Sequence, residues 1–349
     1  MKKLLIIIDG MEDEPCASLG GKTPKEVAYM PGLEFMRLNG HTHMMYTIPQ
    51  GNIPSSDTAI LNILGNDVES GFSGRSWLEA IGSGIEVSPR DLCMRCNLIR
   101  TENHVIASHC SETLIEREAK GIIELLNRCF GSDKVSFHYG CGYRNLLVIN
   151  DCIADVNATP VHELAGCEVS ALAVRSNDSD LQELLNSIIF RSRDILSESY
   201  GEVNGIALWA AGRMPSAKFT QRCGAVVAGT NLVKGIGKAC GLKVIDVIGA
   251  TGDGNTNYSG KLKATLESLE DNEFVLLHIE APDEASHQRK IVLKIQILEK
   301  IDRFIIAPIL KYSKDLEIVV QSDHATSSVT GRHLDKPVEV ITYVMRDRK

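Results

Sequence analysis

The segment Asp283-Glu284-Ala285-Ser286-His287 has the strongest chemical signature in the chain. Its first carboxylate and its imidazole are four residues apart on a turn that enters a helix, so both can reach one divalent ion. Asp323 and His324 follow an apolar run, with adjacent side chains that are expected to diverge, and His333 comes shortly afterwards. Each of these groups alone is also compatible with an ordinary solvated turn.

Two positions near the N-terminus also have residue types that could take part in chemistry. Asp9 directly follows an aliphatic run, which is a common position for a metal ligand and also for a helix cap. Ser56 and Asp57 open a short amphipathic helix, where the plain interpretation is a helix N-cap. The alternative is a hydroxyl that is ionised beside metals and then carries a phosphoryl group, which backbone N–H donors stabilise.

Taken together, these side chains supply oxygen and imidazole ligands for two ions. The candidate ligands are Asp9, Ser56, Asp283, His287, Asp323, His324 and His333. Two divalent ions suit phosphoryl transfer, because one activates the attacking oxygen while the other stabilises the leaving oxygen. The set predicts a two-metal phosphoryl-transfer site more strongly than any one member does.

Three aliphatic runs position these groups. Residues 2–8, 274–279 and 316–320 read as buried parallel strands, and each is followed by carboxylate or imidazole side chains. Open α/β sheets build their sites just beyond the carboxyl ends of such strands. Residues 290–310 repeat apolar positions at helical spacing and should cover one face of the sheet.

The middle of the chain has a different pattern and predicts an inserted domain. Strands are expected at residues 94–100, 146–149 and 171–174, and helices near 112–130 and 179–199. The expected organisation is a metal-binding domain from residues 1–89 and 206–349, interrupted by an inserted domain at residues 90–205.

The composition limits the location and partners of the protein. A chain of 349 residues with 44% hydrophobic side chains can bury a full core in two domains. The net charge of -8, without a basic stripe, argues against nucleic acid as the main ligand. No apolar run spans a bilayer and no signal-peptide pattern follows residues 1–8, so a cytoplasmic location without a membrane partner is expected.

The ten cysteines are expected to be reduced and mostly buried, because they are irregularly spaced and lie mostly within apolar stretches. Cys93 and Cys96 form a C-x-x-C, but no second pair follows at zinc spacing.

The order of motifs resembles the archaeal-type cofactor-independent phosphoglycerate mutases of the alkaline phosphatase superfamily over nearly the whole chain. The matching stretches are Asp9-Gly10-Met11, Leu19-Gly20-Gly21-Lys22-Thr23-Pro24, Ser56-Asp57, Leu64-Gly65, Gly74-Arg75, Leu78-Glu79-Ala80, Tyr143-Arg144, Gly249-Ala250-Thr251, Thr256-Asn257-Tyr258, Gly260-Lys261, Glu280-Ala281-Pro282-Asp283-Glu284-Ala285, His287, Asp323-His324, Thr326 and Arg332-His333.

This resemblance implies an α/β fold in which an alkaline phosphatase-like core holds a mostly parallel sheet flanked by helices. The inserted, smaller α/β domain would close over the substrate. Ser56 would be the phosphorylated nucleophile. One metal ion would be held by Asp283, His287 and His333, and the other by Asp9, Ser56, Asp323 and His324. Manganese or zinc is expected, and ligand chemistry alone does not choose between them.

The resemblance also implies that a small phosphorylated substrate is held by Arg75, His109, Arg144 and Lys261. Guanidinium groups match phosphate and carboxylate geometry in two-point contacts, although each of these residues could equally be a surface charge or a satisfied polar group. The implied reaction interconverts 3-phosphoglycerate and 2-phosphoglycerate through a phosphoserine, without 2,3-bisphosphoglycerate.

Several positions depart from the family's usual pattern. They are Ser55 for glycine, Ser76-Trp77 for Gly-Pro, Asn145 for histidine, Gln288-Arg289 for Gly-Asp and Ala325 for proline. None removes a predicted metal ligand, but several would line the substrate pocket. The reaction class is therefore better indicated than the substrate.

Other functions stay open at this stage. One subgroup of the family is proposed to act as homoserine kinase, and residues 9–15 and 95–98 match its Asp-Gly-Met-x-Asp-Glu-Pro and Arg-Cys-Asn-Leu runs. Residues 249–256 approach a P-loop, but Asn255 replaces the required lysine. A simple phosphatase or sulfatase and a non-catalytic relative are the remaining alternatives.

Overall fold

The computed structural model describes residues 1–68, 74–108, 114–197, 203–215, 218–312 and 315–346. The chain divides into two compact units, one formed by Met1–Ser70 with Lys218–Lys349 and the other by Gly71–Ala217. The second unit extends beyond residues 90–205 on both sides. It does so because helix α4 (Arg75–Gly82) and strand β9 (Gly205–Gly212) both pack against its strand β3 (Leu92–Glu102).

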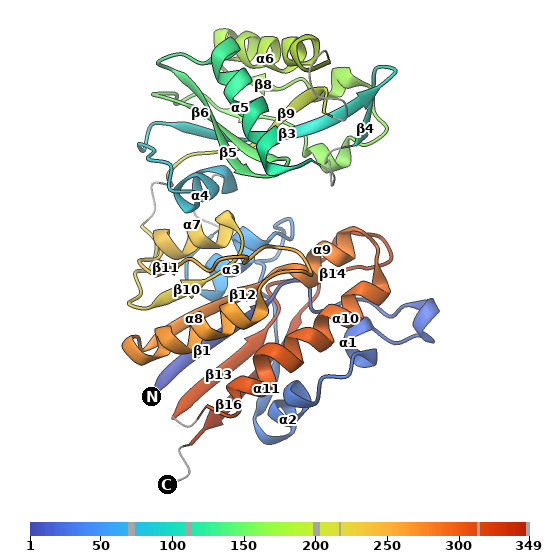
Figure 1. Cartoon of the computed structure of the whole chain (residues 1–349), viewed down its shortest axis with the longest axis vertical. Helices are drawn as coiled ribbons and strands as arrows, with labels where there is room; N and C mark the ends of the chain where they lie inside the picture. Colours follow the sequence, from blue (N-terminus) through green and yellow to red (C-terminus); the bar gives the residue numbers. More distant parts are fainter. Residues whose placement is uncertain (69–73, 109–113, 198–202, 216–217, 313–314, 347–349) are drawn as a thin grey trace. The chain divides into compact units, whose positions relative to one another are not determined.

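The first unit is built on a seven-stranded sheet (Figure 1). Its order is β11 (Lys243–Ile245), β10 (Ala225–Val227), β12 (Phe274–Ile279), β1 (Lys2–Ile8), β13 (Leu316–Gln321), β16 (Val338–Met345) and β2 (His41–Met45). The first five strands run parallel, β16 is antiparallel to β13, and β2 is antiparallel to β16, so only β16 runs against the other strands of this sheet. The prediction of an α/β fold with a mostly parallel sheet is confirmed.

Helices cover both faces of this sheet, which explains why its central strands are almost wholly apolar. Alternate residues of β1 and β12 share one core with α8 (Tyr258–Asp271) and α10 (Ile291–Ile301). On β10, helix α7 (Asn231–Ala239) approaches so closely that a Cβ on Gly237 would lie 2.4 Å from Val226 Cγ1. Only glycine permits this approach.

The helix predicted at residues 290–310 is present with a change of pitch inside it. It consists of α10, a π-helical turn (Asp302–Ile306) and α11 (Ala307–Ile309). The Asp302 carboxylate accepts hydrogen bonds from the Gly32 and Leu33 amides at 3.0 and 2.8 Å. These contacts tie the turn to the start of α2 (Pro31–Asn39).

Shorter elements complete the first unit. They are a 3-10 turn (Ala17–Leu19), α1 (Pro24–Val27), α3 (Ser56–Ile63), α9 (Ala281–His287), β14 (Ala325–Thr326) and β15 (His333–Leu334).

The second unit has an antiparallel sheet with its own hydrophobic core. The strands follow the order β4 (Val105–Ser108), β3, β6 (Arg144–Ile149) and β5 (Val135–Cys141), and β9 also pairs with β3. Its main helices are α4, α5 (Glu116–Phe130) and α6 (Ser179–Ser197). A further small sheet is formed by β7 (Val156–Asn157) and β8 (Arg175–Ser176), and a 3-10 turn spans Val161–Glu163.

Two predictions about local structure were wrong. Residues 171–174 are not a strand, because the chain forms a 3-10 turn at Val169–Leu172 before β8. A short apolar run does not by its pattern distinguish a strand from a buried turn. The cysteines are also not mostly buried, since Cys129, Cys141, Cys167 and Cys223 are exposed.

Among the residues described, no helix combines the length and the hydrophobicity that a membrane-spanning segment requires. The cytoplasmic location stays a prediction.

Candidate metal centre

The predicted ligands of the first unit gather beyond the carboxyl ends of three neighbouring strands. Asp9 follows β1, the segment Ala281–His287 (α9) follows β12, and Asp323 with His324 follows β13. Because β1 pairs with both β12 and β13, the three loops lie side by side.

The first ligand cluster consists of Asp283, His287 and His333, whose ligand atoms all lie within 4.8 Å of one another. His287 Nε2 is 3.0 Å from Asp283 Oδ2 and 3.1 Å from His333 Nε2. The Nδ1 atoms of the two histidines lie 2.8 Å from the Gly331 and Pro54 carbonyl oxygens. A carbonyl only accepts, so each Nδ1 is the donor and Nε2 is left to face the cluster.

The second cluster surrounds His324. Its Nε2 lies 3.2 Å from Ser56 Oγ, 3.6 Å from Asp9 Oδ1 and 3.4 Å from Asp323 Oδ2. The side chains of Asp323 and His324 therefore converge, and the expectation that they diverge was wrong. The loop after β13 is not a regular strand at these residues, so the alternation of side chains between faces does not apply.

His278 was missed by the sequence analysis. It lies on β12 with 1% of its surface exposed, and its Nε2 is 3.5 Å from Asp9 Oδ2. Its ligand atom and those of Asp9 and Asp323 also lie within 4.8 Å of one another. The available signal was a single imidazole interrupting the aliphatic run Phe274–Ile279 directly before the Glu-Ala-Pro-Asp turn.

The buried groups of the second cluster fit a divalent cation. Burial, together with Asp323 and Asp283, raises the pKa of Asp9, and burial with Asp283 raises the pKa of Asp323 to about 6. Within the described part of the chain, Asp9 Oδ1 and Asp323 Oδ2 are buried without a hydrogen-bond partner. Buried carboxylate oxygens without donors are costly, and a metal ion would compensate them.

The charges of the first cluster are strongly coupled. Burial opposes the charged form of His287, but Asp283 prevails and raises the pKa of His287 to about 9. The same attraction holds the pKa of Asp283 well below its usual range despite its burial. Burial and His324 lower the pKa of His333 to about 4.

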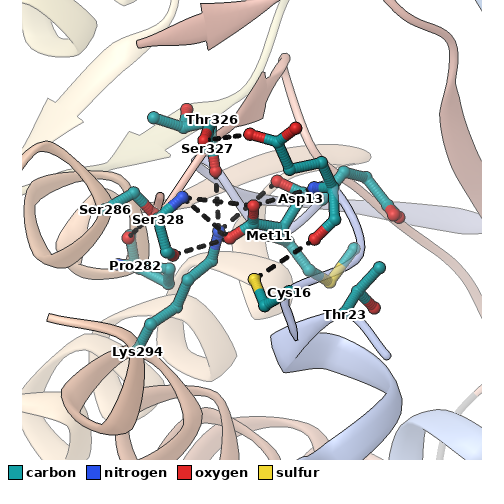
Figure 2. Close-up of polar contacts among 12 residues, drawn as sticks. Met11, Asp13, Cys16, Thr23, Pro282, Ser286, Lys294, Thr326, Ser327 and Ser328 are labelled. Carbon is teal, nitrogen blue, oxygen red and sulfur yellow. Dashed lines mark hydrogen bonds and ion pairs between the residues drawn. The ribbon is translucent and has the colours of Figure 1, made fainter. Parts of the chain in front are cut away.

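A buried polar network lies against these loops (Figure 2). Lys294 Nζ donates to Asp13 Oδ2 at 2.7 Å and to the Thr326 carbonyl at 3.0 Å. Thr326 Oγ1 in turn donates to Asp283 Oδ1 at 2.6 Å. Asp13 also accepts from the Ser328 hydroxyl at 2.6 Å. The ion pair is thus connected to a candidate metal ligand by one intervening residue.

Comparison with known proteins identifies the family. A 2,3-bisphosphoglycerate-independent phosphoglycerate mutase of Methanosarcina barkeri is 35% identical to this chain, over 98% of the chain and 90% of the relative. The chain belongs to this phosphoglycerate mutase family. A probable enzyme of the same name from Geobacter sulfurreducens is 34% identical over 98% of the chain and 90% of the relative. The resemblance inferred from the motifs is confirmed.

The family model described as 2,3-bisphosphoglycerate-independent phosphoglycerate mutase matches residues 38–201. A solved structure of a Pyrococcus horikoshii protein has a TM-score of 0.80 and 27% identity, covering 99% of this chain and 88% of that one. The cofactor-independent phosphoglycerate mutase of Thermoplasma acidophilum has a TM-score of 0.57 and 24% identity, covering 100% and 92%, and shows the shared fold.

The substrate ligands expected for a phosphoglycerate mutase lie in both units. Lys261 belongs to the first unit, is 1% exposed and donates to the His278 carbonyl at 3.3 Å. Burial lowers the pKa of Lys261 to about 8. Arg75 and Arg144 belong to the second unit, and His109 lies outside the described residues.

In the second unit, a carboxylate organises two of the guanidinium groups. Arg75 Nε lies 3.0 Å and Arg95 Nη2 2.7 Å from Glu79 Oε1, which is almost fully buried. Arg95 and Arg75 keep the pKa of Glu79 below its usual value although burial opposes this. Arg144 donates from Nε to the Tyr143 hydroxyl at 3.1 Å.

Proposed function

We propose that this protein interconverts 3-phosphoglycerate and 2-phosphoglycerate without 2,3-bisphosphoglycerate, through a phosphoserine at Ser56. The observation that carries the proposal is the position of Ser56 Oγ, 3.2 Å from His324 Nε2 within a buried group of carboxylates and imidazoles. The activity stated in the names of the relatives supports the same reaction.

Two divalent ions, manganese or zinc, are the proposed cofactors. Asp283, His287 and His333 would hold one ion. Asp9, Ser56, Asp323 and His324 would hold the other. When bound, such ions lower the pKa of the serine hydroxyl and neutralise charge on the transferring phosphoryl group.

Ser56 is the first residue of α3, where backbone N–H groups have no acceptor within the helix and can stabilise phosphoryl oxygens. In the first step, a bond forms between Ser56 Oγ and phosphorus while the bond between phosphorus and O3 of the substrate breaks. In the second step, O2 of the same glycerate attacks, and the bond to Oγ breaks. The proton lost by Ser56 in the first step goes to the departing O3, and the proton lost by the O2 hydroxyl in the second step goes to Ser56 Oγ. The phosphoryl group returns to the same glycerate, so no nucleotide is consumed.

Lys261, Arg75, Arg144 and His109 are the proposed ligands of the substrate's phosphate and carboxylate. Lys261 is suited to an anion because it is buried next to the cluster and still carries its proton at neutral pH. The second unit, which carries Arg75 and Arg144, is the proposed substrate-closing domain.

Phosphorus NMR tests this function directly. Manganese-loaded protein is incubated with 3-phosphoglycerate and no nucleotide, beside a chelator-treated sample. Metal-dependent formation of 2-phosphoglycerate is expected. Release of inorganic phosphate alone would indicate a phosphatase. In a separate sample with ATP and homoserine, phosphoryl transfer to homoserine by protein that lacks mutase activity would indicate the kinase subgroup.

A further inference from the structure

We propose that His278 is an additional ligand of the metal ion held by Asp9 and Asp323. The proposal rests on the two-metal centre of the proposed function and adds a residue that the motifs did not indicate. Its basis is the geometry of a buried imidazole whose ring nitrogens have no hydrogen-bond partner among the described residues.

The His278 side chain lies on the sheet face opposite the core formed with α8 and α10. Its neighbours Leu277 and Ile279 belong to that core, and side chains alternate between faces along a strand. His278 pairs in register with Ile7 on β1, two residues before Asp9. The strand pairing thus brings an imidazole to the carboxylate that ends the neighbouring strand.

Both ring nitrogens of His278 lack a hydrogen-bond partner among the residues described, although the side chain is 1% exposed. A buried imidazole normally pairs at least its N–H group, because desolvation without a partner is costly. Lys261 bonds to the backbone carbonyl of His278 and leaves the ring unpaired. A metal ion would use one of these nitrogens.

The distances match those between two ligands of one ion better than those of hydrogen bonds. Ligand atoms 2.0–2.2 Å from a tetrahedral ion lie about 3.4 Å from one another. His278 Nε2 is 3.5 Å from Asp9 Oδ2, and His324 Nε2 is 3.4 Å from Asp323 Oδ2. A typical N–H···O bond is about 2.9 Å long. His278 Nε2 is therefore separated from Asp9 by the distance expected between two ligands of one ion, as His324 Nε2 is from Asp323.

The test compares His278→Leu with Leu276→Val, a control on the same strand and the same sheet face. Metal content and affinity are measured by chelator competition with manganese and with zinc, and Co²⁺ absorption reports the coordination. For His278→Leu, we expect at least a tenfold loss of affinity for one of the two ions and a changed Co²⁺ spectrum. Leu276→Val should keep both affinities.

Stability separates a ligand from a packing residue. Leucine removes two unpaired nitrogens from a buried site, so metal-free His278→Leu should melt no lower than metal-free wild type. A lower melting temperature of the metal-free variant combined with unchanged metal affinity would overturn the proposal, because it would show a purely structural role.

His278→Gln provides a second variant that keeps a donor atom. Its amide oxygen suits manganese better than zinc, so it should weaken zinc binding more than manganese binding. If every folded variant bound two ions with wild-type affinity, His278 would not be a ligand. If wild-type protein bound two ions but did not convert phosphoglycerate, the proposed function would be wrong. The assignment of His278 as a metal ligand would not be affected by that result. Wild-type protein that binds no ion would overturn both.

Discussion

Lys294 Nζ lies 2.7 Å from Asp13 Oδ2, and both side chains are completely shielded from solvent. The two residues are 281 positions apart in the sequence and join the loop after β1 to helix α10. Lys294 also bonds to the Thr326 carbonyl, and Asp13 to the Ser328 hydroxyl. One ion pair therefore fixes the relative positions of three segments around the candidate metal centre.

Removing only one member of this pair should be strongly destabilising. Lys294→Met leaves the Asp13 carboxylate buried without its counter-charge, so the free energy of unfolding should fall by about 3–5 kcal/mol. The double variant Asp13→Asn/Lys294→Met should recover most of this loss, because no buried charge remains. Urea unfolding of metal-free protein measures both changes.

An exposed ion pair provides the control. Lys3 and Glu317 lie 2.9 Å apart, but the Lys3 side chain is 45% exposed, so Lys3→Met should cost less than about 1 kcal/mol. A double variant as unstable as the sum of Lys294→Met and Asp13→Asn would show that the two residues are not energetically coupled.

Ser56→Ala should abolish phosphoryl transfer, because it removes the atom to which the phosphoryl group is proposed to bind. We expect the rate to fall by about four orders of magnitude or more, as for other nucleophile deletions. Ser55→Ala is the matched control, since the Ser55 hydroxyl lies 3.1 Å from Thr58 Oγ1 and has no proposed chemical role. Equal activity of wild type and Ser56→Ala in the phosphorus NMR assay would exclude the phosphoserine mechanism.

The stabilisation by metal should increase as the pH rises from 6.5 to 8. The pKa of His287 is raised from 6.5 to about 9, so in this range the metal-free native state holds a proton that the unfolded chain releases; the pKa of Asp9 is also raised and acts in the same direction. For these two groups, raising the pH removes stability from the metal-free protein, whereas His333, whose pKa is lowered to about 4, contributes in the opposite direction. Metal binding displaces these protons and becomes stronger.

Thermal unfolding of manganese-loaded and chelator-stripped protein across this pH range measures the effect. The difference between the two melting temperatures should widen with pH, at fixed metal concentration. A constant difference would mean that neither proton is displaced when the metal binds.

The central sheet and much of the candidate site could be predicted because their signals are local. An aliphatic run followed at once by Asp9 identifies both a buried strand and the end at which its loop emerges. Asp283 and His287 are four residues apart on one helical turn, so their proximity follows from helix geometry.

The features that could not be predicted from the sequence depend on contacts between segments that are distant in the chain. No local pattern pairs Asp13 with Lys294, because their contact is created by packing α10 over the loop after β1. In the sequence, His278 is a single polar residue within an apolar strand. Only the register between β12 and β1 shows that its side chain lies beside Asp9. Asp302, in the π-helical turn, likewise accepts hydrogen bonds from the amides of Gly32 and Leu33, which are 270 and 269 positions away in the sequence.

Lys261 should bind the substrate anion with an affinity that depends on its own protonation. Its pKa of about 8 means that the ammonium is charged at pH 7 and mostly neutral at pH 9. The charge of the substrate phosphate is constant in this range, since its second pKa is near 6. The KM for 3-phosphoglycerate should therefore rise from pH 7 to pH 9, and kcat should change less.

Lys261→Met should remove this pH dependence and raise KM by about tenfold at pH 7, the effect of losing one charge-assisted contact.

The Lys261→Met variant should also stabilise the fold by about 3 kcal/mol at pH 7, because burying the charged lysine lowers its pKa from 10.5 to about 8. This gain should shrink as the pH rises from 8 to 10.5. Lys263→Met, at an exposed position of the same helix, is the control. A variant that is more stable but keeps the wild-type KM at pH 7 would show that Lys261 is a buried cation without a role in substrate binding.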